Sequence, residues 1–311
     1  NYAARLTIEP ALQTLKSYSH LTSPHLMQIA PLIKLASQRL ADSSDSPRLD
    51  AELLLGMVLR KSRAQIYSCS NDEISAADQA LFAELLEKRR NHLPIAHITG
   101  RREFWTLNLK VTPDTLVPRP ETELLVEQAL ARIPEESSAR VLDLGTGSGA
   151  AILAIGSERP NCPLYATDIS REALEVAAEN GACSKQQVNW YEGDWFAALP
   201  GEAPMRKFDI IVSNPPYIGI EESGLIDPEL QFEPDIALYS GDDGLSAIRA
   251  IIQTAPEHLN AEGWLLLEHG FTQGEAIRAL LADHNFVEIS TMLDLAGRPR
   301  VTSGRMAATA H

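Results

Sequence analysis

The sequence predicts an α/β protein in which a small helical domain precedes a doubly wound, mainly parallel sheet. After residue 140, short apolar runs alternate with helix-like stretches, which is typical of parallel strands joined by helical crossovers. Before residue 97, apolar residues instead recur at the spacing of amphipathic helices. The 311 residues suffice for two domains, each with its own core.

We expect four segments along the chain. Residues 1–26 carry little regular pattern and are expected to be a poorly ordered extension or tag. Residues 27–96 form the helical domain, and residues 97–117 form a linker whose alternating stretch from Phe104 predicts a hairpin. Residues 118–311 form the sheet domain.

Helix starts in the helical domain are marked by serines. Ile29 to Leu40 carries one apolar face. Ser46 precedes Pro47 as a predicted N-cap, and Ser75 with Asp78 resembles a variant capping box. Nothing in this domain resembles a catalytic site, so we interpret it as a unit that docks a partner.

Seven strands are predicted in the sheet domain, the last of them with antiparallel direction as an option. They are Val141–Leu144, Leu164–Thr167, Val188–Tyr191, Phe208–Ser213, Trp264–Glu268, Phe286–Met292 and Val301–Met306. Helices are expected between the first five strands and between the fifth and the sixth.

Composition restricts the class of protein. Hydrophobic residues make up 44% and charged residues 22% of the chain, and no apolar run approaches the roughly 18 residues that span a bilayer. The net charge of −15 disfavours a broad nucleic-acid surface. Three cysteines without metal-ligand spacing fit a reducing cytoplasm, where we expect a monomer without a metal site.

A glycine-rich loop follows the first strand, at Asp143-Leu-Gly-Thr-Gly-Ser-Gly149. Its spacing differs from the Gly-x-Gly-x-x-Gly loop that holds a dinucleotide pyrophosphate. The carboxylate of Asp143 would repel a phosphate and favours a cationic or zwitterionic ligand. S-adenosyl-L-methionine carries the required charges.

Two further acidic positions follow the second and third strands. Asp168 is placed to accept from ribose hydroxyls, although Asp168 or Ser170 can instead cap the following helix. Asp194 can accept from an adenine amino group while Trp195 packs on the ring, and a buried core tryptophan is an equally good interpretation.

The fourth predicted strand runs into Ser213-Asn214-Pro215-Pro216-Tyr217. Two prolines end the strand and leave an amide side chain and carbonyls without partner N–H groups, a set that can hold a small planar polar group. A plain turn with a capping asparagine is the alternative. In a doubly wound sheet the first and fourth strands are neighbours, so Asn214 is expected to face the glycine loop across one crevice.

These motifs resemble the class I methyltransferases that modify planar nitrogens, and the fuller set resembles the PrmC/HemK family of release factor glutamine-N5 methyltransferases. The resemblance covers about residues 27–307. It is carried by the glycine loop, Asp168, Gly193-Asp194-Trp195 and Asn214–Tyr217, and by Pro94–Gly100, Arg102–Trp105, Pro118–Glu123, Phe232–Pro234, Leu265–Gly270 and Asp294–Arg298.

The resemblance implies a class I S-adenosyl-L-methionine-dependent methyltransferase with a Rossmann-like, doubly wound, seven-stranded sheet. It implies that the helical domain docks peptide chain release factors, whose Gly-Gly-Gln glutamine is methylated at N5 with S-adenosyl-L-homocysteine as product. Phe104, Arg119 and Glu123 are candidate site residues by resemblance alone. The residues implied to contact the methyl donor are Gly145, Thr146, Gly147, Ser148, Gly149, Asp168, Trp195 and Asn214, and those implied to hold the glutamine are Asn214, Pro215, Pro216 and Tyr217.

The predicted mechanism starts from the weak nucleophilicity of an amide nitrogen. The Asn214 oxygen and the Pro215 carbonyl would accept the two N–H bonds of the substrate amide and stabilise positive charge on its nitrogen, while Tyr217 packs on the amide plane. No general base is required.

Two other functions use the same residues. An adenine-N6 or guanine-N2 methyltransferase would present the same two N–H bonds to Asn214, but the acidity of the chain disfavours a nucleic-acid substrate. A catalytically idle protein that senses the methyl donor is the third possibility, and the intact Asn-Pro-Pro-Tyr stretch argues against it.

Overall fold

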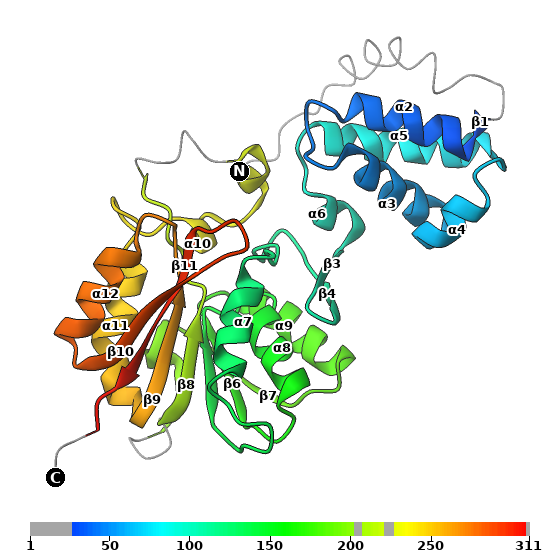
Figure 1. Ribbon diagram of the computed structural model, residues 1–311. Helices are drawn as coiled ribbons and strands as arrows, with labels where there is room; N and C mark the ends of the chain where they lie inside the picture. The colour runs from blue at the N-terminus through cyan, green and yellow to red at the C-terminus, as the bar shows by residue number, and fades with distance from the viewer. Residues whose placement is uncertain (1–26, 202–206, 221–226, 309–311) are drawn as a thin grey trace, which may run out of the picture. The chain divides into compact units, whose positions relative to one another are not determined.

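The computed structural model describes residues 27–201, 207–220 and 227–308, so the predicted extension 1–26 lies outside the described residues. The chain divides into two compact units, Asn1–Thr99 and Gly100–His311, and the boundary falls inside the predicted linker. The first unit is helical, whereas the second is a sheet covered by helices (Figure 1).

The described part of the first unit is a small helical bundle with a short antiparallel ribbon. Leu32, Leu54 and Phe82, from three different helices, are fully buried in one cluster. The helices are α2 (Ile29–Arg39), α3 (Pro47–Leu59), α4 (Arg63–Ser68), α5 (Ala76–Arg90) and α6 (Ile95–Thr99), and the ribbon pairs β1 (Met27–Gln28) with β2 (Glu73–Ile74).

Both serine-marked helix starts are present, but only one serine makes a capping hydrogen bond. The Ser75 hydroxyl accepts from the backbone N–H of Asp78 at 3.1 Å. Pro47 is the first residue of α3 as predicted, yet the Ser46 side chain makes no capping bond and donates instead to the Asp50 carboxylate at 3.4 Å. Ser46 has ψ 57°, away from the extended conformation of a capping residue, and an acceptor lies one turn ahead of it.

A buried ion pair joins α3 to α5. Arg89 Nε donates to Asp50 Oδ2 at 2.6 Å, and the two side chains are 5% and 4% exposed. Ser44 Oγ donates to the same carboxylate oxygen at 2.7 Å. Each of the two side chains therefore neutralises a buried charge that would lower stability if it had no partner.

The predicted hairpin is present and belongs to the second unit. Strands β3 (Arg101–Phe104) and β4 (Leu107–Lys110) pair antiparallel. Phe104 and Leu109 are buried in a core cluster of that unit. The apolar positions of the alternating pattern thus anchor the hairpin on the sheet domain.

The second unit contains a seven-stranded sheet in the order β10-β11-β9-β8-β5-β6-β7. All predicted strands are present, and β9 begins earlier than expected, at Leu259. The antiparallel option for the last strand is confirmed, because β11 pairs antiparallel with both neighbours. The strands are β5 (Val141–Leu144), β6 (Leu164–Asp168), β7 (Val188–Glu192), β8 (Phe208–Ser213), β9 (Leu259–Glu268), β10 (Phe286–Leu293) and β11 (Pro299–Met306).

Alternate residues of the central strands enter two separate cores. Val141 and Val212 pack in one cluster with α7 and α8, whereas Leu142 and Ile211 pack in another with α11 and α12. The sheet is therefore covered on both faces (Figure 1). The helices of this unit are α7 (Thr122–Leu130), α8 (Ala150–Glu158), α9 (Arg171–Cys183), α10 (Asp235–Leu238), α11 (Ser246–His258) and α12 (Gly274–Asp283), with 3₁₀ turns η2 (Trp195–Ala198) and η5 (Pro228–Phe232).

One predicted crossover helix is replaced by a shorter turn in the described residues. Between β7 and β8 the structure has η2, a 3₁₀ turn, where an α-helix was expected. Pro200 and Gly201 follow immediately, and proline cannot continue a helix. The connection leaves Asp194 and Trp195 beside the ends of the strands.

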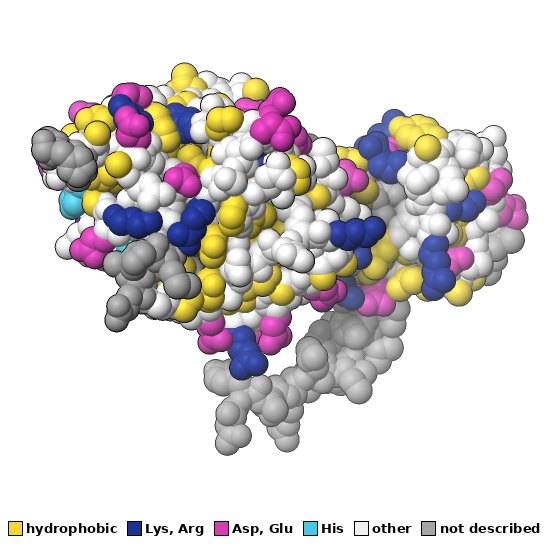
Figure 2. Space-filling view, turned by 90° about the horizontal axis from the view of Figure 1, so that it is seen from below, with side chains coloured by type: hydrophobic (Ala, Val, Ile, Leu, Met, Phe, Trp, Pro, Cys, Tyr) yellow, Lys and Arg dark blue, Asp and Glu magenta, His cyan; other side chains and the backbone are white. Residues whose placement is uncertain are grey.

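Charged side chains of both signs are mixed on the surface. On the face shown in Figure 2, Lys and Arg side chains stand singly or in small groups among acidic, apolar and uncharged ones. Over the whole sequence, acidic residues exceed basic ones, 42 to 27.

Asp50→Ala is expected to destabilise the helical unit by about 3–5 kcal/mol, because it leaves Arg89 buried without its carboxylate. The matched control is Glu84→Ala, which removes an exposed partner of Lys88 in the same unit and should cost about 0–1 kcal/mol. Hydrogen–deuterium exchange of peptides from α3 and α5 in the full chain measures both effects. Equal effects of the two substitutions would contradict the prediction.

Candidate active site

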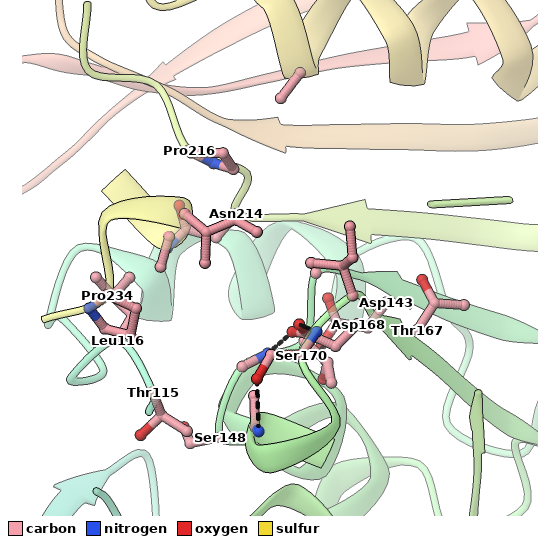
Figure 3. A pocket seen from close by; sticks show the side chains of 18 of the residues that line it. Thr115, Leu116, Asp143, Ser148, Thr167, Asp168, Ser170, Asn214, Pro216 and Pro234 are labelled. Atoms are coloured by element: carbon pink, nitrogen blue, oxygen red, sulfur yellow. Dashed lines mark hydrogen bonds between the residues drawn. The ribbon is translucent and has the colours of Figure 1, made fainter. Parts of the chain in front are cut away.

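A cavity of about 420 Å³ lies at the carboxyl ends of the parallel strands of the second unit. The pairing of Leu144 with Ser213 brings the loops after β5 and β8 together, as the predicted strand order requires. Figure 3 shows Asp143, Asp168 and Asn214 around this space. The lining includes these predicted site residues: Gly145, Thr146, Gly147, Ser148, Asp168, Trp195, Asn214 and Pro216.

The glycine loop turns tightly at the mouth of β5. Gly145 and Gly147 have φ angles of 68° and 55°, in the left-handed region that favours glycine. A Cβ at Gly145 would lie 3.1 Å from the Trp195 ring. Gly149, by contrast, is outside the cavity lining, and a Cβ there would meet Leu153 at 3.1 Å. It serves the packing of α8.

Asp143 is buried beneath the loop that it precedes. Its side chain is held by the Thr146 hydroxyl, which donates to Oδ2 at 2.6 Å, and the residue is 2% exposed. Burial raises the pKa of the Asp143 carboxyl to about 7, and the nearby Asp168 adds to the increase. The loop thus encloses a carboxyl group that gains or loses its proton near neutral pH.

Asp168 connects the loops that follow β5 and β6. Its Oδ2 accepts from the Gly147 N–H at 2.8 Å and its Oδ1 from the Ser170 N–H at 2.9 Å. Burial raises the pKa of the Asp168 carboxyl, and these backbone donors oppose the increase. Ser170 is the residue that caps α9, since its hydroxyl accepts from the Ala173 N–H at 3.1 Å. Asp168 is therefore free of the capping role.

Trp195 is shared between the cavity and the core, and its packing on an adenine ring stays a prediction. Its ring lies over Gly145 and lines the cavity, and it also packs against the core cluster beneath α11. Ile169 adds a second apolar surface, because it lines the cavity with 52% of its side chain exposed. Sequence reasoning missed Ile169, although a large apolar residue directly after the acid, where a polar turn residue is usual, could have indicated it.

Asn214 lies where β8 ends, and only one of the two polar atoms of its side-chain amide has a hydrogen-bond partner within the described ranges. The Nδ2 atom donates to the Thr122 hydroxyl at 3.2 Å. The Oδ1 atom is buried and has no hydrogen-bond partner among the described residues. Buried polar atoms are seldom left unpaired, so this oxygen is an open acceptor for a ligand N–H.

The rest of the Asn-Pro-Pro-Tyr turn is divided between the cavity and the core. Pro216 lines the cavity, whereas Pro215 and Tyr217 are outside its lining. Tyr217 packs against the core cluster beneath α11, and burial raises the pKa of its hydroxyl. Its carbonyl accepts from Gln273 Nε2 at 2.9 Å.

The stretch before α7 both starts that helix and lines the cavity. Leu116 and Pro118 are lining residues, and Leu116 lies near Pro234 (Figure 3). Glu233 fixes this wall: its carboxylate accepts from the Val117 N–H at 3.0 Å and pairs with Arg119.

Two candidates that rested on resemblance alone are outside the cavity lining. Phe104 is a core residue. Glu123 Oε1 accepts from the Trp105 N–H at 2.9 Å and so holds the hairpin. Both residues support the structure around the site.

The cavity has the size and chemistry of a small-molecule site. Its volume lies in the range of about 300–1,000 Å³ that is usual for ligand pockets. Apolar surface from Ile169 and Trp195 stands beside the acceptor groups of Asp168 and Asn214. Among the described residues no group of His, Cys, Asp and Glu could hold a metal ion.

Comparison with known proteins matches both parts of the chain. The family model described as the PrmC N-terminal domain matches residues 31–100, and the model described as the methyltransferase small domain matches residues 120–224. A release factor glutamine methyltransferase of Xylella fastidiosa is 48% identical over 83% of this chain and 93% of its own length. One of Coxiella burnetii is 45% identical over 90% of this chain and 99% of its own length.

A solved structure shares the fold. The catalytic domain of hMettl16, in complex with the MAT2A 3'UTR hairpin 6, superposes with a TM-score of 0.53 at 13% identity, covering 71% of this chain and 82% of that one. At this identity the likeness concerns the fold alone.

Asp143→Asn is expected to flatten the pH dependence of stability. Because the folded pKa of Asp143 is about 7, above the ordinary value of 3.8 for an aspartate, the folded state binds a proton that the unfolded state releases between these values. Its contribution to stability is therefore largest at low pH and falls by about 2 kcal/mol between about pH 5.5 and pH 8. Asparagine does not titrate.

Denaturant unfolding of both proteins at the two pH values measures the difference. Other buried carboxyl groups with raised pKa values, such as Glu268, leave part of the slope in the variant. A slope unchanged by Asp143→Asn would contradict the prediction.

Proposed function

The chain belongs to the release factor glutamine methyltransferase family, and we propose that it transfers a methyl group from S-adenosyl-L-methionine to the N5 nitrogen of the glutamine in the Gly-Gly-Gln motif of peptide chain release factors. The observation that carries this proposal is the open Oδ1 of Asn214, which lies opposite the glycine loop. An acceptor without a donor of its own suits a substrate that brings N–H bonds.

The glycine loop and Asp168 would hold the methyl donor. Each Asp168 carboxylate oxygen accepts one backbone N–H and has a further lone pair for a ribose hydroxyl. The apolar surfaces of Ile169 and Trp195 are suited to an adenine ring, and Asp194 is an acceptor beside them. When bound, the donor supplies an electrophilic methyl group on a positively charged sulfur.

Asn214 and Pro215 would hold the substrate amide. The Asn214 oxygen accepts one N–H of the glutamine side chain and the Pro215 carbonyl accepts the other, which orients the nitrogen and stabilises positive charge on it. A glutamate in the same place has no N–H to offer, and sites of this kind can reject such analogues by about 10⁴. Packing of the Tyr217 ring on the amide stays a prediction, since Tyr217 contacts the core.

The proposal also includes the partners, the oligomeric state and the cellular location of the protein. The family match supports docking of release factors by the helical unit, and the net charge of −15 supports the absence of a nucleic-acid substrate. A monomeric state stays a prediction. No helix in the described ranges is long and apolar enough to cross a membrane. Cys69, Cys162 and Cys183 are free thiols, which supports the cytoplasm as the place of action.

The proposed function is tested with a donor that carries a labelled methyl group. The protein is incubated with a release factor, with the same factor changed from Gly-Gly-Gln to Gly-Gly-Glu, and with nucleic acid. We expect label on the glutamine of the first substrate alone. Label on adenine or guanine would replace the proposal by a nucleic-acid methyltransferase, and donor binding without transfer to any substrate would indicate a sensor.

Asn214→Ala should lower turnover by about 10²–10³, the effect of losing one hydrogen bond that strengthens in the transition state. The control is Asn189→Ala, because Asn189 Nδ2 donates to the Leu164 carbonyl on an outer strand, outside the cavity lining. Methyl transfer at saturating donor and calorimetric donor affinity are measured for both variants. Near-normal turnover in Asn214→Ala, with the donor still bound, would refute the role of this side chain.

A further inference from the structure

We propose that Thr122 and Glu268 are positioning residues that fix the orientation of the Asn214 amide and thereby determine which chemical group the site accepts. This inference rests on the proposed function and adds to it two residues that do not touch the reacting atoms. They come from the start of α7 and the end of β9, on either side of the turn that carries Asn214.

The three side chains form a continuous series of polar groups, of which Asn214 and Thr122 line the cavity. Asn214 Nδ2 donates to Thr122 Oγ1 at 3.2 Å, and the Thr122 side chain hydrogen-bonds the Glu268 carboxyl. Thr122 is 4% exposed and Glu268 1% exposed. Solvent therefore cannot substitute for a lost partner at either position.

The hydrogen bonds that link Asn214, Thr122 and Glu268 have a defined donor-to-acceptor direction. A hydroxyl has one proton and can accept through its lone pairs. When the Thr122 proton is directed to the Glu268 carboxylate, Thr122 can only accept from Asn214. The amide nitrogen of Asn214 then faces Thr122, and its oxygen remains for the substrate.

Without the carboxylate, this direction is lost. A Thr122 hydroxyl that is free to rotate can donate to Asn214 Oδ1, which turns the amide so that its NH₂ group faces the substrate. The NH₂ group of Asn214 would then face the N–H of the substrate amide, in the place where the Asn214 oxygen should accept that N–H. Glu268 thus acts on the reaction through two other side chains.

Packing alone does not account for Glu268. Its Oε2 has no hydrogen-bond partner among the described residues, and a buried carboxylate with an unpaired oxygen costs stability that an apolar side chain would not. A buried carboxyl group of this kind beside a residue that lines the cavity is a candidate for a functional role.

Glu268 also makes the arrangement sensitive to pH. The charged and titratable groups around it are Arg119 and Glu121 before α7, Arg300 on β11 and Tyr217 after β8. Burial raises the pKa of the Glu268 carboxyl to about 7. Once protonated, the carboxyl can itself donate to Thr122, so turnover should fall as the pH decreases below about 7.

The test compares Thr122→Val with Thr122→Ser in the full-length protein. Valine has the shape of threonine without the hydroxyl, whereas serine keeps it. We expect Thr122→Val to lower kcat by about tenfold or more, as loss of a hydrogen bond in the site does, with donor Kd within about twofold of wild type. Thr122→Ser should restore kcat to within about threefold. Equal kcat values for the two variants overturn the proposal.

Two further measurements separate positioning from general damage. In an Asn214→Ala background, Thr122→Val should have no further effect on single-turnover rates, because it acts through Asn214; additive losses overturn the proposal. Glu268→Gln should make the decrease of kcat below about pH 7 smaller, with Asp143 accounting for any remainder, and a decrease as large as in the wild type overturns the assignment to Glu268.

An activity-independent measurement distinguishes failure of this inference from failure of the proposed function. With ¹⁵N-asparagine labelling, the Asn214 side-chain NH₂ signal is identified by its loss in Asn214→Ala. Its proton exchange should be slow in wild type and Thr122→Ser and at least about tenfold faster in Thr122→Val, because a paired buried donor is protected. Equal exchange rates overturn the inference. Absence of methyl transfer by wild type overturns the proposed function instead.

Discussion

The parallel pairing of β5 with β8 is the interaction on which the site depends. It places Leu144 opposite Ser213, so the glycine loop and Asn214 begin side by side although 69 residues separate the two partners along the chain. The Ser213 hydroxyl reinforces this contact by donating to the Leu144 carbonyl at 2.7 Å. Because both strands are buried on two faces, neither can shift in register without moving apolar side chains out of the two cores. The positions of the glycine loop and of Asn214, the groups proposed to bind the methyl donor and the amide, are thus consequences of core packing.

Polar groups are concentrated at the carboxyl ends of these strands. Burial raises the pKa values of Asp143, Asp168 and Glu268; Asp143 and Glu268 have threonine hydroxyls as partners, whereas Asp168 has backbone N–H groups. The strands below them contribute almost only apolar side chains. The domain therefore has an apolar core that provides stability and a polar edge that lowers stability. The residues proposed to take part in the reaction lie at this edge.

Local pattern predicted what depends on neighbours in the sequence. The seven strands followed from apolar runs, and the cavity-lining glycines, Asp168, Trp195 and Asn214 followed from motifs at strand ends. Contacts between distant segments could not be predicted in this way: Thr122 meets Asn214 across 92 residues, and Arg119 meets Glu233 across 114. Gly149 and Tyr217 belong to the motifs but are outside the cavity lining, where Gly149 packs at the start of α8 and Tyr217 against the core beneath α11, so their contact with a ligand stays a prediction. A motif identifies residues that act together without showing which of them face the cavity.

The Asp168 carboxylate has a consequence for the entropy of ligand binding. It ties the Gly147 N–H to the Ser170 N–H through bonds that are internal to the chain, at 2.8 and 2.9 Å. The conformational freedom of the two loops is therefore lost when the chain folds and not when a ligand arrives. A preorganised loop of this kind binds with a smaller ordering cost. In the proposed function it would offer the same surface to the methyl donor and to the demethylated product, so exchange of one for the other would require no refolding of the loops.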